Sequence, residues 1–333
     1  MDQKIKVVFF QRKPLPFHRS IEAIFKDVRH KMPNRLFGLM YEFSCFSKGI
    51  FPRIRIILEA KKNQGQINHI TGDIHFAAIG LPKKNTLLTV HDCIFLENSK
   101  GLKYLVLKYF WFTLPLKYCK YVTVVSEATK NELLKFINYP EQNIYVIPNA
   151  IDGGYKYLPS DFNESCPQIL LVGTTHNKNL ERLIEAIKDI PCRLNIIGIL
   201  SQDLIYLLEK NKIVYVNYTN LSQEAIIQQY IDCDMLSFVS TYEGFGMPII
   251  EANATGRPVI TSNLLSMPDV AGNAAHLVNP YDIESIRYGI VKIIQDKHYR
   301  DTLVANGLEN CKRFDAQKVA DNYVELYDKM LAE

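Results

Sequence analysis

The sequence predicts an α/β protein with two doubly wound parallel sheets. Short, nearly continuous apolar runs recur along the 333 residues and alternate with segments of helical periodicity. Such runs are typical of parallel strands covered by helices on both faces, and their repetition as βα units predicts doubly wound sheets. The length suits two ordinary domains. A hydrophobic content of 47% with 22% charged residues is typical of a globular soluble protein.

The expected elements follow from these runs. Strands are predicted over residues 5–10, 87–90, 121–125, 144–147, 169–172, 194–197, 213–216, 235–239 and 259–261. Helical periodicity and length predict helices over 179–190 and 222–233, among others. The segment 150–159 is rich in Gly, Tyr and Pro, and we expect it to connect the two sheets. In such sheets ligands gather beyond the carboxyl ends of the strands, which is where site residues are sought.

Charge divides the chain into a basic and an acidic half. Residues 1–150 carry 23 Lys and Arg against 11 Asp and Glu, whereas residues 151–333 carry 16 against 24. This asymmetry suggests two domains with different partners. The basic half suits an anionic membrane, an anionic acceptor or nucleic acid, but no nucleic-acid motif accompanies it and we expect no nucleic-acid partner. Seven dispersed cysteines without a CxxC pair indicate reduced thiols in the cytoplasm, and no signal peptide or membrane span is expected.

Residues 236–263, LSFVSTYEGFGMPIIEANATGRPVITSN, carry the strongest functional signal. An apolar strand leads through a Gly-rich turn into a helix that begins at Pro248 and ends at Gly256. The amides of residues 244–246 and the helix N-terminus form a cradle suited to phosphate. Glu243 and Glu251 would repel phosphate unless they aim at sugar hydroxyls, which donate hydrogen bonds to carboxylates. This combination predicts a nucleotide-sugar site, although the spacing alone is more simply that of two surface glutamates.

The same stretch resembles the signature of glycosyltransferase family 4, which comprises retaining enzymes of the GT-B fold. The E-x7-E pattern lies within YEGFGMPIIEANATGRPVITS, and the flanking SFVST and NLLSMPDVAGNAAHLVNP match the family as well. The resemblance implies two Rossmann-like domains facing across a cleft. It also implies that Glu251 holds the ribose hydroxyls and that Glu243 contacts the sugar ring. The donor-binding turn would be completed by Gly244, Phe245, Gly246 and Met247.

The resemblance also sets the expected domain boundaries. The last helix, over 315–331, resembles the family's carboxyl-terminal helix, which crosses back onto the first domain. We therefore expect an amino-terminal, acceptor-side domain of residues 1–152 with 315–333. Residues 153–314 would form the nucleotide-sugar-binding domain.

A second donor-binding segment is expected at residues 169–186. A strand, then Gly173, then a basic residue entering a helix, make a reasonable phosphate site, but the segment is neither GxGxxG nor a P-loop. The resemblance implies an arginine and a lysine that hold the diphosphate, and Lys178 matches the lysine. The alternative is that Lys178 is an ordinary lysine at a helix start. The arginine is missing, and its place is taken by Thr174, Thr175, His176 and Asn177. This departure leaves the leaving-group charge without its usual partner unless His176 or another basic residue substitutes. Tyr218, which follows another strand, should approach the nucleobase.

Histidines mark the candidate residues of the first half. NHITGDIHFAAIG followed by VHD-x-IFL resembles the family's amino-terminal domain, where the histidine matching His91 approaches the donor hexose across the cleft. Asp92 beside it is expected only to orient His91. Without that resemblance a lone histidine is more often structural. After the first strand, RKPLPFHRS replaces the glycine-rich loop of many relatives. His18 and Arg19 there are candidate acceptor contacts, and a solvated helix-cap region is the simpler and favoured interpretation.

Residues 101–122, GLKYLVLKYFWFTLPLKYCKYV, contain the only tryptophan, Trp111, and four lysines. A segment that is hydrophobic on all sides predicts a buried core helix. The lysines do not fall on one helical face, and Pro115 interrupts the helix. The alternative is a membrane-interface element, which the aromatic and lysine content suits.

Together these features predict a retaining glycosyltransferase that moves a hexose-type sugar from a nucleotide diphosphate to a carbohydrate or lipid-linked acceptor. His91, Glu243 and Lys178 are the expected catalytic residues, with Lys178 and the glycine amides stabilising the leaving group. No metal or other cofactor is expected. Family analogy indicates lipopolysaccharide, capsule or exopolysaccharide synthesis by a cytoplasmic protein, peripheral on the inner face of the plasma membrane. The alternatives are a nucleotide-sugar epimerase of the same fold and a non-catalytic partner subunit.

Overall fold

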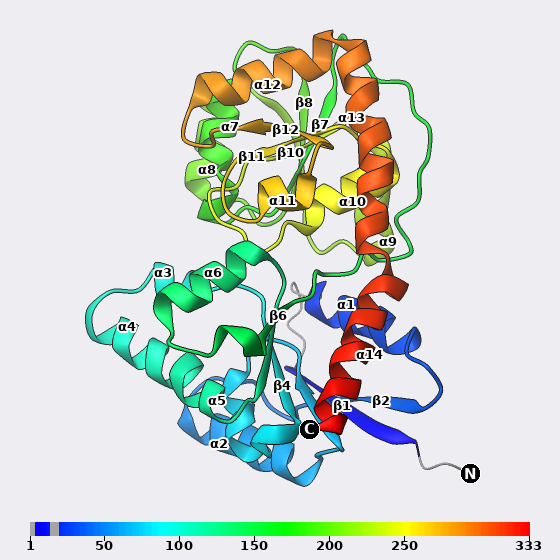
Figure 1. The fold of residues 1–333 in the computed structure, drawn as a ribbon. Coiled ribbons are helices and arrows are strands. Elements are labelled where there is room, and N and C mark those ends of the chain that lie inside the picture. Colours follow the sequence, from blue (N-terminus) through cyan, green and yellow to red (C-terminus); the bar gives the residue numbers. More distant parts are fainter. Residues whose placement is uncertain (1–3, 14–19) are drawn as a thin grey trace. The chain divides into compact units, whose positions relative to one another are not determined.

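In the computed structural model the chain forms two compact units (Figure 1). The structure describes residues 4–13 and 20–333, the side chains of residues 20–23 excepted. Unit 1 comprises Met1–Ala150 and Ala316–Glu333, and unit 2 comprises Ile151–Asp315. The chain passes from unit 1 to unit 2 after Ala150, two residues before the boundary expected from the sequence. It returns to unit 1 after Asp315, one residue after the expected boundary.

Unit 1 is built on a six-stranded parallel sheet with the strand order β2-β1-β3-β4-β5-β6. Its strands are β1 (Ile5–Gln11), β2 (Leu36–Glu42), β3 (Ile67–Ile70), β4 (Thr86–Val90), β5 (Tyr121–Val124) and β6 (Ile144–Val146). Its helices are α1 (Ser20–His30), α2 (Ile50–Lys62), α3 (Ile94–Glu97), α4 (Gly101–Leu107), α5 (Leu114–Lys117), α6 (Glu127–Phe136) and α14 (Ala316–Ala332). A π-helical turn, η3 (Lys108–Thr113), joins α4 to α5.

Two apolar clusters cover the two faces of this sheet. Residues of α2, η3, α5 and α6 share one cluster with inward side chains of the strands. Residues of α1 and α14 share the other. The buried ring of His69 in β3 lies between the Tyr327 hydroxyl of α14 and the Thr89 hydroxyl of β4, each at 2.7 Å. The last helix is therefore fixed to unit 1 by both apolar packing and a buried polar network.

Unit 2 repeats the design with the strand order β12-β11-β10-β7-β8-β9, again all parallel. Its strands are β7 (Gln168–Val172), β8 (Arg193–Ile197), β9 (Val214–Tyr218), β10 (Met235–Phe238), β11 (Val259–Ser262) and β12 (Ala275–Val278). Its helices are α7 (Leu180–Ile187), α8 (Gln202–Lys210), α9 (Gln223–Asp232), α10 (Met247–Thr255), α11 (Met267–Ala271), α12 (Ile283–Gln295) and α13 (Lys297–Asn310). Helices α7, α8 and α12 share one core cluster, whereas α9, α11 and α13 contact α10.

The order of the strands fixes where a ligand can bind in unit 2. From β7 the chain winds outward through β8 and β9, and from β10 it winds the other way through β11 and β12. The carboxyl ends of β7 and β10 are therefore neighbours at the point where the winding reverses. Ligands of doubly wound sheets bind at such a switch point. In unit 1 the corresponding point lies between β1 and β3.

The predicted fold class is confirmed, and so are the nine expected strands, whose ends differ from those observed by at most two residues. Strands β2, β3 and β12 were not expected. The expectation of a buried helix over 101–122 is wrong for its first ten residues, because Leu102 is 76% exposed and Leu105 is 59% exposed. Tyr104 and Leu107 are half-buried against the core, and full burial begins at Phe112, in the π-helical turn. Among the described residues no helix is both long and apolar enough to cross a membrane.

Candidate active site

In the loop after β7, the side chain of Lys178 lies next to Gly173, the residue that follows the strand. Gly173 has a left-handed backbone (φ 91°), and a Cβ atom there would lie 2.8 Å from Cε of Lys178. Its amide donates to the carbonyl of Ile197 at the end of β8, at 2.8 Å. The backbone conformation therefore favours glycine here, and the absence of a side chain leaves room for Lys178 close to the strand end.

Lys178 and Glu243 meet at the switch point. Lys178 Nζ donates to Glu243 Oε1 at 2.6 Å, and each side chain is less than a fifth exposed. The same ammonium group lies 4.7 Å from the centre of the Phe238 ring in β10. Sixty-five residues separate the two partners in sequence. The fold thus places the lysine and the first glutamate of the E-x7-E motif in direct contact.

Asn177, one of the residues in place of the family's arginine, takes part in the same cluster. Its side-chain amide donates to the Tyr242 carbonyl at 3.0 Å and to Glu243 Oε1 at 3.2 Å. His176, in contrast, has a side chain that is 94% exposed and lies 3.7 Å from Glu181. Of the residues that stand where the resemblance implies an arginine, Asn177 therefore bonds to Glu243, whereas the exposed His176 ring lies near Glu181.

A buried serine that the sequence analysis did not single out donates hydrogen bonds to the glycine-rich turn of residues 243–246. Ser266, fully buried and four residues after β11, donates to the carbonyls of Glu243 and Phe245, at 3.0 and 2.7 Å. The Phe245 ring is buried against Phe314, so this residue offers a ligand mainly its backbone. Gly246 takes a positive φ of 121°, and α10 then begins with Pro248 in its first turn. The helix N-terminus, with its partial positive charge, follows the turn directly.

Glu251 lies one turn into α10 and is bound by two tyrosines. The Tyr230 hydroxyl of α9 donates to Glu251 Oε2 at 2.5 Å, and the Tyr155 and Tyr230 rings meet edge to face at 5.4 Å. Loss of solvation raises the pKa of Glu251 to about 7, although hydrogen bonds from Tyr230 and Tyr155 and the charge of Lys178 favour the ionised form. No sequence motif pointed to these tyrosines. The only available signal was that Tyr230 falls within the helix expected over 222–233.

The carboxyl ends of β8 and β9 lie beside the loop that follows β7. A Cβ atom at Gly198 would lie 2.8 Å from Cγ2 of Thr174, and the Gly198 amide donates to the carbonyl of Tyr218 at 2.9 Å. Tyr218 is the last residue of β9, the edge strand, which lies two strands away from β7. A hollow of about 310 Å³ opens beside these loops. It is lined by Thr174, His176, Glu181, Ser201, Asp203, Leu204, Tyr206 and Leu207.

His91 belongs to unit 1, where it follows β4. Its Nε2 lies 2.8 Å from the carbonyl of Thr71 at the end of β3, and since a carbonyl only accepts, Nε2 carries the proton. Asp92 Oδ1 accepts from the amide of Ile94, the first residue of α3, at 3.0 Å. The ion pair of Arg12 and Asp73, at 2.9 Å, lies at the switch point of this sheet and was not singled out in the sequence. The candidate acceptor residues His18 and Arg19 lie outside the described residues.

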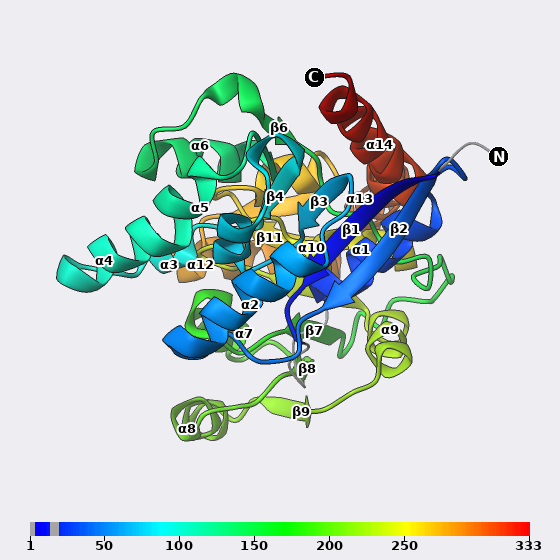
Figure 2. The ribbon, with the colours of Figure 1, turned by 90° about the horizontal axis from the view of Figure 1, so that it is seen from below.

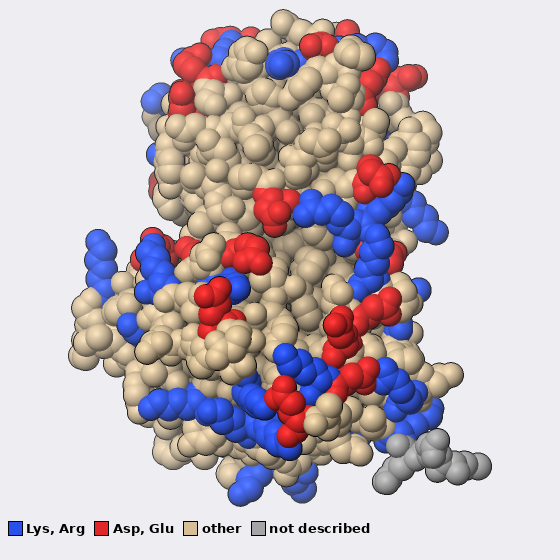
Figure 3. All heavy atoms as spheres, in the orientation of Figure 1, with Lys and Arg blue, Asp and Glu red and all other residues tan. Residues whose placement is uncertain are grey.

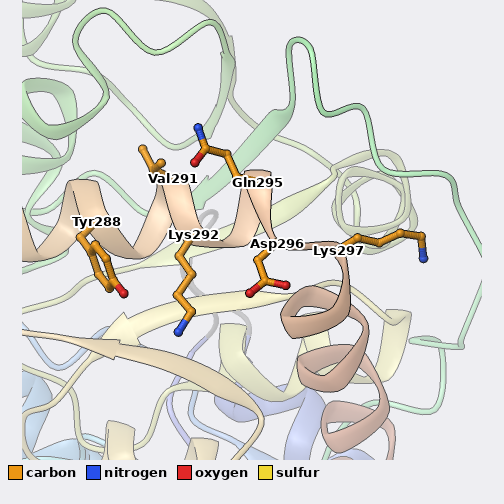
Figure 4. A pocket seen from close by; sticks show the side chains of 6 residues that line it. All are labelled: Tyr288, Val291, Lys292, Gln295, Asp296 and Lys297. Carbon is orange, nitrogen blue, oxygen red and sulfur yellow. The ribbon is translucent and has the colours of Figure 1, made fainter.

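A larger hollow of unit 2, about 450 Å³, lies along α12 and the start of α13, not at the strand ends (Figure 4). Tyr288, Lys292 and Asp296 extend from one side of α12 and its carboxyl end, and Val291 and Gln295 extend from the other side. Asp296 caps α13 through the amide of Tyr299, and Lys292 covers the Tyr299 ring at 4.2 Å. These charged groups are engaged in local structure, so the hollow is not the active-site candidate.

Two doubly wound parallel units are the architecture of the GT-B fold, and comparison with known families agrees. The model described as Glycosyltransferase Family 4 matches residues 4–153, and the model described as Glycosyl transferases group 1 matches residues 159–310. The two matches together span almost the whole chain. The protein therefore belongs to the GT-B glycosyltransferases that these families describe.

Similar proteins include enzymes of O-antigen synthesis. The chain is 28% identical to O-antigen chain mannosyltransferase B of Escherichia coli, with 62% of this chain and 60% of that protein aligned. It is also 28% identical to O-antigen chain mannosyltransferase RfbU of Salmonella typhimurium, with 75% and 70% aligned. The chain thus spans about three fifths of the first relative. It aligns with about a fifth, 21%, of the serotype-specific mannosyltransferase WbdA of Escherichia coli.

Solved structures show the same fold at low sequence identity. HepE of Anabaena, solved with UDP and glucose, superposes with a TM-score of 0.80 at 16% identity, covering 98% of this chain and all of that one. WaaG, a glycosyltransferase involved in lipopolysaccharide biosynthesis, superposes with a TM-score of 0.74 at 14% identity, covering 96% and 99%.

Proposed function

We propose that the protein is a retaining glycosyltransferase that transfers a sugar from a nucleotide diphosphate to a saccharide or lipid-linked acceptor. The observation that carries the proposal is the contact of Lys178 with Glu243 at the switch point, with Glu251 within electrostatic range of the same lysine. A cation, a glycine-rich turn and a helix N-terminus suit a diphosphate, and the two carboxylates suit the hydroxyls of the sugars at its ends.

The chemistry follows from these roles. The bond between the anomeric carbon and the phosphate oxygen breaks, and negative charge develops on the departing nucleotide diphosphate. Lys178 and the amides of the turn after Glu243 stabilise that charge. The acceptor hydroxyl attacks from the face that the phosphate leaves, and its proton passes to a phosphate oxygen, which gives retention. Lys178 and Asn177 both donate to Glu243, and these bonds favour a carboxylate that binds hydroxyls over one that attacks carbon.

This mechanism requires no metal or other cofactor, because Lys178 and the N-terminus of α10 supply the positive charge. Transfer should therefore proceed at an unchanged rate in EDTA. His91 of unit 1 is the remaining proposed catalytic residue. With Nε2 donating to Thr71, its Nδ1 is the nitrogen that would accept from a sugar hydroxyl.

Donor and acceptor are proposed from the relatives. Two aligned relatives are named as O-antigen mannosyltransferases, so a nucleotide-diphosphate mannose is the first donor to test. HepE was solved with UDP and glucose, which makes UDP-glucose the second. The excess of Lys and Arg in residues 1–150 suits an acceptor carried at an anionic membrane, consistent with cell-surface polysaccharide assembly on the cytoplasmic side.

A donor screen followed by product analysis tests the proposal. UDP-, GDP- and dTDP-sugars are screened by thermal shift, and the best one is incubated with the protein alone and with saccharide acceptors. We expect slow hydrolysis without acceptor and a new glycoside of retained anomeric configuration with it. Formation of an isomeric nucleotide sugar would instead identify an epimerase. Failure of every nucleotide diphosphate to bind would identify a non-catalytic partner subunit, the alternative that the missing arginine favours.

A further inference from the structure

Helix α2 of unit 1 carries an apolar stripe on the side turned away from the protein core. Ile50, Phe51, Ile54 and Leu58 are 72%, 85%, 48% and 60% exposed. Their spacing places them along one side of the helix, while Ile56 and Ala60 are buried beneath the opposite side. A helix that is apolar on both its inner and its outer side is incompletely covered.

Helix α4 and the following η3 carry a second stripe of the same kind. Leu102, Leu105, Val106, Tyr109 and Phe110 are 76%, 59%, 47%, 44% and 54% exposed. They follow one another at helical spacing, whereas Tyr104 and Leu107 turn inward onto the core. Exposed large apolar side chains that follow one side of a helix in this way indicate an interaction site.

The two stripes belong to one layer of unit 1. Both elements pack on the same apolar cluster at one face of the sheet, so their outer sides both face away from it. The guanidinium of Arg53 in α2 lies 5.0 Å from the centre of the Trp111 ring in η3 and joins the two elements. Figures 1 and 2 both show α2 and α4 on the same side of the sheet. We call the exposed apolar side chains of α2, α4 and η3, together with the cations around them, the interfacial surface.

The segments that carry the two stripes are rich in Lys and Arg. Residues 48–62 contain five Lys and Arg and a single acidic residue, Glu59, which is paired with Arg55 at 3.0 Å. Residues 99–120 contain five lysines and no acidic residue. On the face drawn in Figure 3, the part of unit 1 that holds α4, α5 and α2 shows Lys and Arg with uncharged surface between them. Long basic side chains next to exposed apolar ones allow the charged ends to reach headgroups while the stems stay in apolar surroundings.

We propose that the interfacial surface binds the headgroup region of an anionic phospholipid bilayer. Exposed aliphatic and aromatic side chains are removed from water only by contact with acyl chains or other apolar groups. A nucleic-acid backbone offers no such apolar groups. The Lys and Arg residues of these segments complement anionic lipid, each adding about fivefold to binding near the surface. The proposal stands on this surface alone, so a protein that bound vesicles but transferred no sugar would still satisfy it. If transfer also occurs, the surface places unit 1 where a lipid-linked acceptor is carried.

Vesicle binding by the full chain tests the proposal. Sedimentation with vesicles of phosphatidylcholine and phosphatidylglycerol (about two to one) is compared with vesicles of phosphatidylcholine alone. We expect binding to the anionic vesicles that weakens as salt screens the lysines. The emission of Trp111, the only tryptophan, should shift to the blue on binding, because it packs between Arg53 and Phe95 beneath the surface.

Variants distinguish binding through this surface from non-specific binding to vesicles. Phe51→Asp and Leu102→Asp, one on each stripe, should each weaken binding about tenfold to hundredfold, the range expected for loss of one inserted large apolar side chain. Tyr288→Asp in unit 2, also exposed (63%), is the matched control and should bind as the unmodified protein does. Equal binding by all three variants, or no binding to anionic vesicles by the unmodified chain, overturns the proposal. So does a dimer that the Phe51 and Leu102 variants convert to a monomer, because the surface would then be a protein interface.

Discussion

Replacing Tyr230 with Phe removes one hydroxyl and should change the pH dependence of donor binding. The proposed role of Glu251 is to accept hydrogen bonds from ribose hydroxyls, which an ionised carboxylate does best. Its pKa of about 7, raised by loss of solvation, means that the unmodified protein should lose donor affinity as pH falls through 7. Affinity should fall about tenfold for each further pH unit, because only the ionised fraction binds well.

The size of the shift follows from the hydrogen bond. The Tyr230 hydroxyl donates to Glu251 Oε2 at 2.5 Å and stabilises the ionised form. A hydrogen bond to a charged group contributes about 1.5–3 kcal/mol, which corresponds to about one to two pKa units. Tyr230→Phe should therefore move the pKa of Glu251 upward to between about 8 and 9. Donor affinity at pH 7 should fall roughly 5- to 50-fold and recover at about pH 9.5.

Calorimetric titration of the donor between pH 6 and 9.5 measures this effect. Tyr299→Phe is the matched control, since it also removes a hydroxyl of unit 2 that bonds to a ring nitrogen, of His276, away from Glu251. A Tyr230→Phe protein whose pH profile coincides with that of the unmodified chain would refute the reasoning. An equal loss of affinity at every pH, in a folded protein, would show that Tyr230 contributes packing only.

Three further predictions concern individual contacts. Because the folded state raises the pKa of Glu251 from 4.5 to about 7, its ionisation opposes folding above pH 7 and has no effect below pH 4.5. Glu251→Gln should therefore raise the free energy of unfolding in urea at pH 8 by up to about 3 kcal/mol and leave it unchanged at pH 4.5; no difference between the two pH values would contradict this. Asn177→Ala removes one donor to Glu243 and should lower kcat about tenfold while nucleotide diphosphate affinity stays the same; unchanged kcat would remove Asn177 from its positioning role. Tyr327→Phe deprives the buried His69 Nδ1 of its partner and should lower the free energy of unfolding by about 1–3 kcal/mol without changing donor affinity; equal urea midpoints would show that the network contributes nothing to stability.

Strands made almost entirely of apolar residues could be predicted from the sequence. Strands that bury polar residues, or that are half exposed, could not. Strand β3 contains Asn68 and His69, both fully buried, and the partner that makes His69 acceptable comes from α14, more than 250 residues later. Strand β2 is a half-exposed edge strand interrupted by Gly38. Helix α10, in contrast, begins and ends where Pro248 and Gly256 indicated, because proline and glycine act through the local backbone.

The sequence singles out the residues of the candidate site but not the contacts between them. Glycine-rich turns and paired glutamates are readable in a linear sequence. The pairing of Lys178 with Glu243, and of Tyr230 with Glu251, depends on which strands are neighbours in the folded sheet. Composition also misjudged α4. A segment apolar on every side predicts burial, and the structure instead leaves its outer side exposed.

The central claim is that Glu251 binds the nucleoside and Glu243 the transferred sugar of one donor. It is tested most directly by calorimetric titration with the best donor sugar nucleotide and, separately, with its sugar-free nucleotide diphosphate. Glu251→Ala should weaken both ligands alike, by roughly 10- to 100-fold. Glu243→Ala should weaken the sugar nucleotide by a similar factor and leave the nucleotide diphosphate unchanged. Binding of both ligands by both variants with the affinity of the unmodified protein would contradict the account.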